Sequence, residues 1–293
     1  VQNLTETPLV NRAGRNTLKV KAEASQFEVS LNGQLLARFR DYAQDHGGVG
    51  VFASGGTQTR FRAFRWMVDE AQYARRMEQG GAFAFVKEQG LPAAFSDDFT
   101  SPSWLVGTSG RAVFEYENNR YVIDNTRGQA MAVSYRTEPV VKAGMVSAVV
   151  TSAEGEKGNG YGIAFCWTMQ DGQPYYYAFV IARDGTYKVF RNEGGVAQQL
   201  TDWIEFPFAV DYSRPQLLGV SFIRDDIGMR IFVGINGRML DEVIDPNPLE
   251  FGGFALVAAP QILIKVSSVN VFSFEGKENE ALAALTGALK EKE

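Results

Sequence analysis

Apolar and polar positions alternate along most of this chain, and the alternation predicts short β-strands. Val, Ile, Phe and Tyr recur at near-alternate positions, and Asn-Gly, Asp-Gly and Gly-Gly pairs interrupt them where tight turns are expected. Strand-like stretches lie within 95–125, 145–167, 174–195, 202–206 and 217–235, and roughly a dozen strands fit between 95 and 274. That number is enough for two packed sheets, so we expect an antiparallel β-sandwich.

Two segments follow a helical period instead. In 68–90, Asp69 can cap a helix and the glycine pair at 80–81 can end it, which makes this segment a helical connector. Its buried stripe would consist of Ala71, Tyr73, Ala74 and Met77. Residues 278–293 predict a second helix, which we expect to pack on the sandwich or to tether a following domain, because short isolated helices are marginal in water. Its apolar side carries Leu282, Leu285 and Leu289.

One hairpin pattern occurs twice. The stretch "EVSLNGQLLARFRD" occupies 28–41, and "RIFVGINGRMLDEVID" occupies 230–245. Both place an Asn-Gly pair between two strand-like stretches, and such a pair supplies the positive φ angles of a two-residue type I′ turn. Turns of this kind predict the cross-strand pairs Val29–Leu36 and Val233–Leu240.

The similarity continues beyond the hairpin when residues 18–68 are laid over 218–274. "HGGVGVFAS" at 46–54 matches "FGGFALVAA" at 251–259, and "TRFRAFRW" at 59–66 matches "IKVSSVNVFSF" at 264–274. The first copy lacks the many strands that precede the second, so its apolar side would stay uncovered. We expect an upstream domain or a neighbouring subunit to complete residues 16–68, with packing of a small sheet on the second sandwich as the alternative.

The motifs of the second copy resemble a known family. "FSDDFTSPSW", "NGYGIAFCW", "YYYAFVIARDGTYKVFRNEGG", "INGRMLDEVID" and "GGFALVA…VSSVNVFSF" follow in the order found in concanavalin A-like, laminin-G-like jelly-roll modules of bacterial surface and exported proteins. The bacterial 3-keto-disaccharide hydrolase family uses the same sandwich. The resemblance implies a complete module over 95–274 and the last third of another over 16–68. It says little about function, because this superfamily includes lectins, glycanases and adhesion modules.

These observations give an all-β prediction, an antiparallel jelly-roll sandwich of the concanavalin A-like type with a partial second sandwich at the N-terminus. The expected divisions are the C-terminal part of a first module at 1–68, a helical connector at 69–93, the complete sandwich at 94–275 and a C-terminal helix at 276–293.

Charge and single residues exclude several classes of function. The chain has 29 basic and 34 acidic residues and no basic tract, so nucleic acid is not an expected partner. No apolar run is long enough to span a bilayer, and residues 1–20 lack the pattern of a signal peptide. The single cysteine, Cys166, excludes an internal disulfide framework and is interpreted as a small buried residue. The single histidine, His46, excludes a histidine pair and is interpreted as a turn residue.

Aromatic residues are the strongest indication of a binding face. Flat rings stack on the apolar faces of sugars, and a sheet can present several rings in a row. The stretch 174–182 is apolar on both faces, so most of its rings are expected in the core. The rings expected to be exposed to a ligand are Trp167, Tyr176 and Tyr187.

Acid catalysis on sugars requires two suitably spaced carboxylates. Related glucanases carry a Glu-x-Asp-x-x-Glu pattern, which is absent here. The nearest approximations are Glu115 with Glu117, and the group Asp241, Glu242 and Asp245, all beside turns. No catalytic residue is therefore predicted. No cofactor is predicted either, although the family resemblance leaves calcium open, with oxygen donors at Asp97, Asp98, Asp124 and Asn125.

The expected function is a non-catalytic concanavalin A-like module of a larger exported or cell-surface protein, located outside the cell or in its envelope. It would bind a glycan or make assembly contacts. Two alternatives stay open: a glycoside-processing hydrolase of the 3-keto-disaccharide type, and a structural subunit completed by strands from a neighbouring chain.

Overall fold

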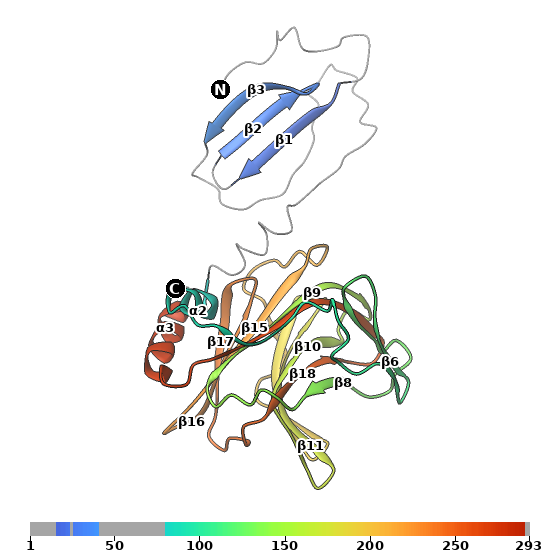
Figure 1. The fold of residues 1–293 in the computed structure, drawn as a ribbon, viewed down its shortest axis with the longest axis vertical. Helices are drawn as coiled ribbons and strands as arrows, with labels where there is room; N and C mark the ends of the chain where they lie inside the picture. The colour runs from blue at the N-terminus through green and yellow to red at the C-terminus, as the bar shows by residue number, and fades with distance from the viewer. Residues whose placement is uncertain (1–15, 24–25, 41–79, 291–293) are drawn as a thin grey trace. The chain divides into compact units, whose positions relative to one another are not determined.

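The computed structural model describes residues 16–23, 26–40 and 80–290, shown in Figure 1. The chain divides into two compact units, Val1–Trp66 and Met67–Glu293. Within the described residues, no helix is long and apolar enough to cross a membrane. His46 and the expected helix over 69–79 lie outside the described residues, as do the stretches 46–54 and 59–66.

The second unit contains a nine-stranded antiparallel sheet. Its main path runs in the order β17 (Arg238–Asp245), β16 (Gly228–Ile235), β15 (Gln216–Asp225), β9 (Gly144–Gly155), β19 (Ile262–Ser273), β7 (Tyr121–Asp124), β6 (Ala112–Tyr116) and β5 (Gly107–Ser109). The ninth strand, β4 (Ala93–Asp97), pairs with β19. Strands distant in sequence are therefore neighbours, as in a jelly roll.

A seven-stranded antiparallel sheet faces it. The order is β13 (Val196–Gln199), β12 (Thr186–Glu193), β11 (Gln173–Ala182), β10 (Gly160–Gln170), β18 (Gly253–Ala258) and β8 (Ala132–Arg136), with β14 (Ile204–Glu205) pairing with β12. Apolar side chains from both sheets form one continuous core. The rings of Phe165 on β10 and Phe222 on β15 stack across it with centroids 5.1 Å apart. The predicted concanavalin A-like jelly-roll sandwich is confirmed.

Two helices cover the outer face of the nine-stranded sheet, α2 (Ala82–Glu88) and α3 (Glu278–Lys290) (Figure 1). Leu285 of α3 is buried, and Phe85 of α2 meets Phe274 edge to face with centroids 5.3 Å apart. The predicted C-terminal helix and its packing role are confirmed. The glycine pair at 80–81 was predicted to end a helix, yet α2 follows it directly.

The described strands of the first unit form a three-stranded antiparallel sheet, β1 (Leu18–Glu23), β2 (Gln26–Leu31) and β3 (Gln34–Arg40). The two predicted hairpin turns are confirmed: φ is 53° and 85° at Asn32 and Gly33, and 54° and 78° at Asn236 and Gly237. These are the left-handed angles that a type I′ turn requires.

The predicted cross-strand pairs were wrong in both hairpins, for the same reason. The register shifts after Val29 in one hairpin and after Val233 in the other, so Val29 pairs with Ala37 and Val233 pairs with Asp241. A β-bulge adds one residue to the returning strand, Leu36 in the first hairpin and Leu240 in the second. The two hairpins therefore share an irregularity as well as a turn.

Candidate binding face

A row of aromatic rings crosses the outer face of the seven-stranded sheet. Tyr135 on β8 stacks on Trp167 of β10 with centroids 4.8 Å apart and planes 20° apart. Trp167 stacks in turn on Tyr176 of β11, at 4.7 Å and 24°, and Phe190 of β12 meets Tyr176 edge to face at 6.3 Å. Small residues such as Ala255 on β18 lie on the same face and leave room for the rings. We call Tyr135, Trp167, Tyr176 and Phe190 the aromatic row.

A β-bulge in β10 puts Trp167 on this face. Strict alternation after Phe165, which points into the core, would send Trp167 into the core as well. Cys166 instead adopts φ 52°, the register shifts beside it, and both Phe165 and Cys166 face the core. Trp167 therefore turns outward. Bulges commonly redirect a side chain in this way beside functional sites.

The aromatic row is half-embedded in the protein. Trp167 and Tyr176 are each 4% exposed, whereas Tyr135 is 46% exposed. Burial raises the pKa of Tyr176 to about 12. The indole Nε1 of Trp167 is buried and has no hydrogen-bond partner among the described residues. A buried N–H donor without a partner is uncommon in folded proteins, and a ligand acceptor is one way to satisfy it.

A second exposed ring lies over the same face. Trp203, 41% exposed, packs over Gly160, where an added Cβ would come within 3.0 Å of the indole ring. The ammonium of Lys188 lies 4.9 Å from the centroid of Trp203 and 5.6 Å from that of Phe190. Burial lowers the pKa of Lys188. The face thus combines a stacked row, one cation and two exposed rings.

The three rings predicted to contact a ligand do not lie together. Trp167 and Tyr176 are in the aromatic row, but Tyr187 points into the core, is 3% exposed and stacks on Phe206 at 5.4 Å. Burial, and then the Asp241 carboxylate, raise the pKa of Tyr187 to about 12. The expectation that all three rings are exposed was wrong, because neighbouring rings cover each of them. Tyr135, Trp203 and Lys188 were missed, although the alternation in 132–136 already set Tyr135 opposite the core.

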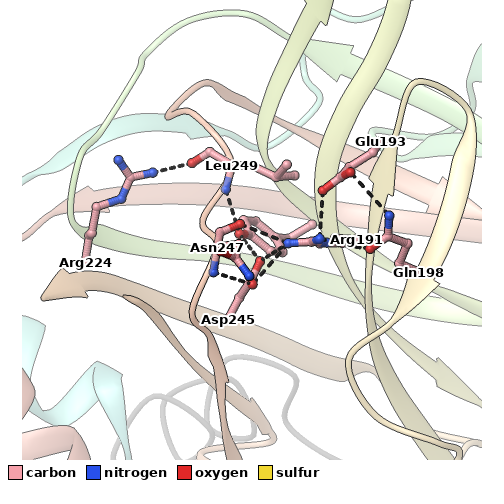
Figure 2. A network of polar contacts seen from close by, with 8 residues as sticks. Arg191, Glu193, Gln198, Arg224, Asp245, Asn247 and Leu249 are labelled. Atoms are coloured by element: carbon pink, nitrogen blue, oxygen red, sulfur yellow. Dashed lines mark hydrogen bonds and ion pairs between the residues drawn. The ribbon is translucent and has the colours of Figure 1, made fainter. Parts of the chain in front are cut away.

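A polar network joins the two sheets at another place (Figure 2). The guanidinium of Arg191 donates to both carboxylate oxygens of Asp245, at 2.8 and 3.1 Å, and to the carbonyl of Asn247 at 2.9 Å. Its other nitrogens reach Glu193 at 3.0 Å and Gln198 at 2.9 and 3.1 Å.

Asp245 is held from several directions although it is only 2% exposed. Tyr177 donates its hydroxyl to the carboxylate at 2.7 Å, and the N–H of Asn247 donates at 3.0 Å. The same hydroxyl accepts the N–H of Leu249 at 2.9 Å. Burial is the main cause of the raised pKa of Tyr177. Since each charge has a close partner, we interpret the network as a tie between β12 and β17.

Two of the remaining carboxylates considered for catalysis form ion pairs. Glu117 forms an ion pair with Lys265, and Glu242 forms one with Arg230. Glu115, the other member of the first group, is exposed on β6. Cys166 is buried as predicted, and burial raises its pKa to about 12.

The loop after β4 forms a hollow of about 380 Å³ that includes Asp97 and Asp98. Asp97 accepts hydrogen bonds from the N–H of Phe99 at 2.7 Å and from the indole of Trp104 at 3.0 Å. The hydroxyl of Thr100 donates to Asp98 at 2.7 Å and lowers the pKa of that carboxyl.

The other two oxygen donors considered for calcium lie after β7. Asp124 accepts the N–H of Thr126 at 2.9 Å. Asn125 is buried and donates to the carbonyls of Ala130 and Ala258, both at 2.9 Å. In the part of the chain that the structure describes, no group of three or more His, Cys, Asp or Glu side chains is placed to hold a metal ion.

Comparison with family models finds no match for this chain, and comparison with curated proteins finds none either. Solved structures with the same type of fold do match. The carbohydrate binding module CBM66 from Bacillus subtilis is 13% identical, with a TM-score of 0.44 over 58% of this chain and 96% of that one. The Bacillus licheniformis beta-glucanase is 8% identical, with a TM-score of 0.45 over 62% and 98%. A Bacillus subtilis protein of unknown function with a galectin-like fold is 11% identical, with a TM-score of 0.48 over 62% and 96%. These likenesses concern the fold alone.

Proposed function

We propose that this protein is a non-catalytic glycan-binding module that binds sugar on the outer face of its seven-stranded sheet. The observation that carries the proposal is the aromatic row, with the buried indole N–H of Trp167 in its middle. Sugar rings have apolar C–H faces that cover flat aromatic rings and hydroxyls that accept hydrogen bonds. An aromatic surface with a small number of placed polar groups is typical of binding sites for small organic ligands.

The exposed rings and the buried rings have different roles in the proposed site. Tyr135 and Trp203 present the area that a sugar ring would cover, while Trp167 and Tyr176 hold Tyr135 in a fixed orientation. Rigid rings lose little conformational entropy on binding, which favours affinity. We accordingly propose an extracellular or cell-envelope location, where polymeric glycans are found.

A hydrolase is the second candidate, and the hollow beside Asp97 and Asp98 is the observation that favours it. Glycoside hydrolysis needs one carboxyl with a raised pKa as the general acid. The pKa of Asp98 is lowered instead, chiefly by the hydroxyl of Thr100, and Asp97 is engaged by Phe99 and Trp104. These contacts suit a structural loop, so the binding function has the stronger support.

The proposal is tested by screening the protein on a glycan array and measuring the affinity for the best ligand by titration calorimetry. Tyr135→Ala and Trp203→Ala are expected to weaken binding about tenfold each, roughly 1.4 kcal/mol, because each removes one stacking surface. Tyr135 and Trp203 are 46% and 41% exposed and lie outside the core, so both variants should keep the fold.

The matched control is Ile227→Ala, which removes another exposed apolar side chain, 55% exposed, in the turn between β15 and β16. Its affinity should equal that of the parent protein. A folded protein that binds nothing on the array contradicts the proposal. Release of reducing sugar that Asp98→Asn abolishes would favour the hydrolase instead.

A further inference from the structure

The sheet of the first unit repeats three strands of the complete sandwich down to individual hydrogen bonds. The backbone N–H of Asn32 donates to the carbonyl of Thr17, and the N–H of Thr17 donates to Oδ1 of Asn32, both at 2.8 Å. In the second unit, Asn236 and Leu217 exchange the same two bonds at the same 2.8 Å. Each turn asparagine therefore fixes the start of the strand that precedes its hairpin.

The strand registers match as well. Leu18 pairs with Leu31 as Leu218 pairs with Ile235, and Val20 pairs with Val29 as Val220 pairs with Val233. Together with the shared turn and bulge, this register identifies β1, β2 and β3 as the counterparts of β15, β16 and β17. The strand on the other side of β15 is β9, which sets Ala148 opposite Leu218 and Val146 opposite Val220.

In the described part of the first unit, no strand takes the place that β9 has beside β15. Among the described residues, β1 pairs with β2 alone. Leu218 and Val220 are both 0% exposed in the complete sandwich, whereas their counterparts Leu18 and Val20 are 62% and 55% exposed. An apolar strand edge in this state is a template for pairing with a further strand.

The opposite face of the first sheet is charged. Glu28 of β2 and Arg38 of β3 form an ion pair at 2.6 Å. In the complete sandwich the position of Glu28 is taken by Phe232, which is buried beneath α2 and α3. Lys19 of β1 is exposed on this face, where β15 has Gly219. Burial against apolar side chains is therefore expected only on the face that carries Leu18 and Val20.

We propose that the edge of β1 that faces away from β2 binds one antiparallel β-strand from a partner polypeptide, in the register in which β9 pairs with β15. The incoming strand has small or branched apolar residues opposite Leu18 and Val20, and polar or acidic residues opposite Lys19. A second copy of β1 fits poorly, because its own lysine would face Lys19. Main-chain hydrogen bonds supply the affinity, and the alternating side chains supply the register.

The probe is a labelled synthetic peptide with the sequence of β9, Gly144–Gly155, added to the full chain. Fluorescence anisotropy is expected to show saturable binding. A peptide carrying Val146→Asp and Ala148→Asp has the same backbone but sets charges against Leu18 and Val20, and should bind at least tenfold more weakly. Equal binding of the two peptides, or no binding of either, overturns the proposal.

Register is tested by disulfide formation. A peptide with Ser147→Cys is expected to cross-link to the full chain carrying Lys19→Cys, because Ser147 lies opposite Gly219 in the complete sandwich. The matched control is Ser30→Cys, which pairs with Lys19 but lies one strand further from the edge. Cross-linking at least tenfold faster at Lys19→Cys supports the proposal. Equal rates at both positions, or rapid dimerisation of Lys19→Cys chains without peptide, overturn it.

Discussion

At the scale of single residues, the aromatic side chains do two different kinds of work. Tyr177 and Phe179 fill the core, while Tyr176, the residue before Tyr177, faces outward into the aromatic row. Alternation along a strand explains this division without further help. Trp167 is the exception, because the left-handed backbone at Cys166 decides which face its ring takes.

Buried weak acids make the stability of the protein sensitive to alkaline pH. Burial raises the pKa of Cys166 from 9.0 to about 12, and those of Tyr176 and Tyr187 from 10.0 to about 12. In the unfolded chain these groups lose their protons at the lower values, so above about pH 9 the unfolded state binds fewer protons than the folded state. The free energy of unfolding should therefore have its full value below about pH 9 and fall as the pH rises towards 12.

Urea denaturation at a series of pH values from 8 to 12 measures this loss. Each group contributes a slope of up to roughly 1.4 kcal/mol per pH unit between its two pKa values. Cys166→Ala should move the onset from near pH 9 to near pH 10, where the tyrosines begin to titrate. A free energy of unfolding that stays constant up to pH 12 would contradict the assignment of these groups to the interior.

At the scale of elements, the hairpin turns are more than connections. Asn236 accepts the N–H of Leu217 at 2.8 Å and donates to Gln216 at 2.7 Å, while its own backbone holds φ at 54°. One residue thus sets the turn and joins the hairpin to β15. An Asn-Gly pair signals the turn in sequence, but the contacts with the preceding strand depend on how the three strands assemble.

Replacing Asn236 separates these two contributions. Asn236→Gly keeps the left-handed backbone but loses both side-chain hydrogen bonds, and should lower the free energy of unfolding by about 2 kcal/mol. Asn236→Ala should cost roughly 1 kcal/mol more, since alanine tolerates positive φ poorly. Urea denaturation monitored by tryptophan fluorescence provides the measurement.

Asn119 is the matched position, since it has φ 57° in another tight turn and an exposed side chain. Asn119→Gly should therefore change the free energy of unfolding by no more than about 0.5 kcal/mol. A loss at Asn119→Gly as large as that at Asn236→Gly would show that the contacts with Gln216 and Leu217 contribute nothing measurable.

At the scale of the whole molecule, the second unit has everything that a folded module requires. Its two sheets share one core, and α2 with α3 cover the outer face of β15, β16 and β17. The sheet of the first unit repeats those three strands without a second sheet among the described residues. The same pattern of three strands therefore occurs once within a complete two-sheet sandwich and once in the sheet of the first unit.

A chain that starts at residue 67 should fold and unfold as one cooperative unit. Its thermal midpoint should match that of the main transition in the full chain, and its glycan affinity should agree within twofold, because the aromatic row lies entirely in the second unit. Differential scanning calorimetry and titration calorimetry measure the two quantities. A clear loss of either one would mean that residues before 67 contribute to the sandwich or to its binding face.

The sequence by itself determined the strands, the turns, the sandwich and the repeat, because period-two alternation and Asn-Gly pairs act locally on the backbone. Tertiary structure alone decided that Tyr187 faces the core, that Trp167 turns outward at a bulge, and that Tyr135 meets Trp167 across a strand between them. The cross-strand pairs of the hairpins belong to this second group. Bulges and neighbouring strands shift the register by single residues, and a shift of one residue reverses the face on which a side chain lies.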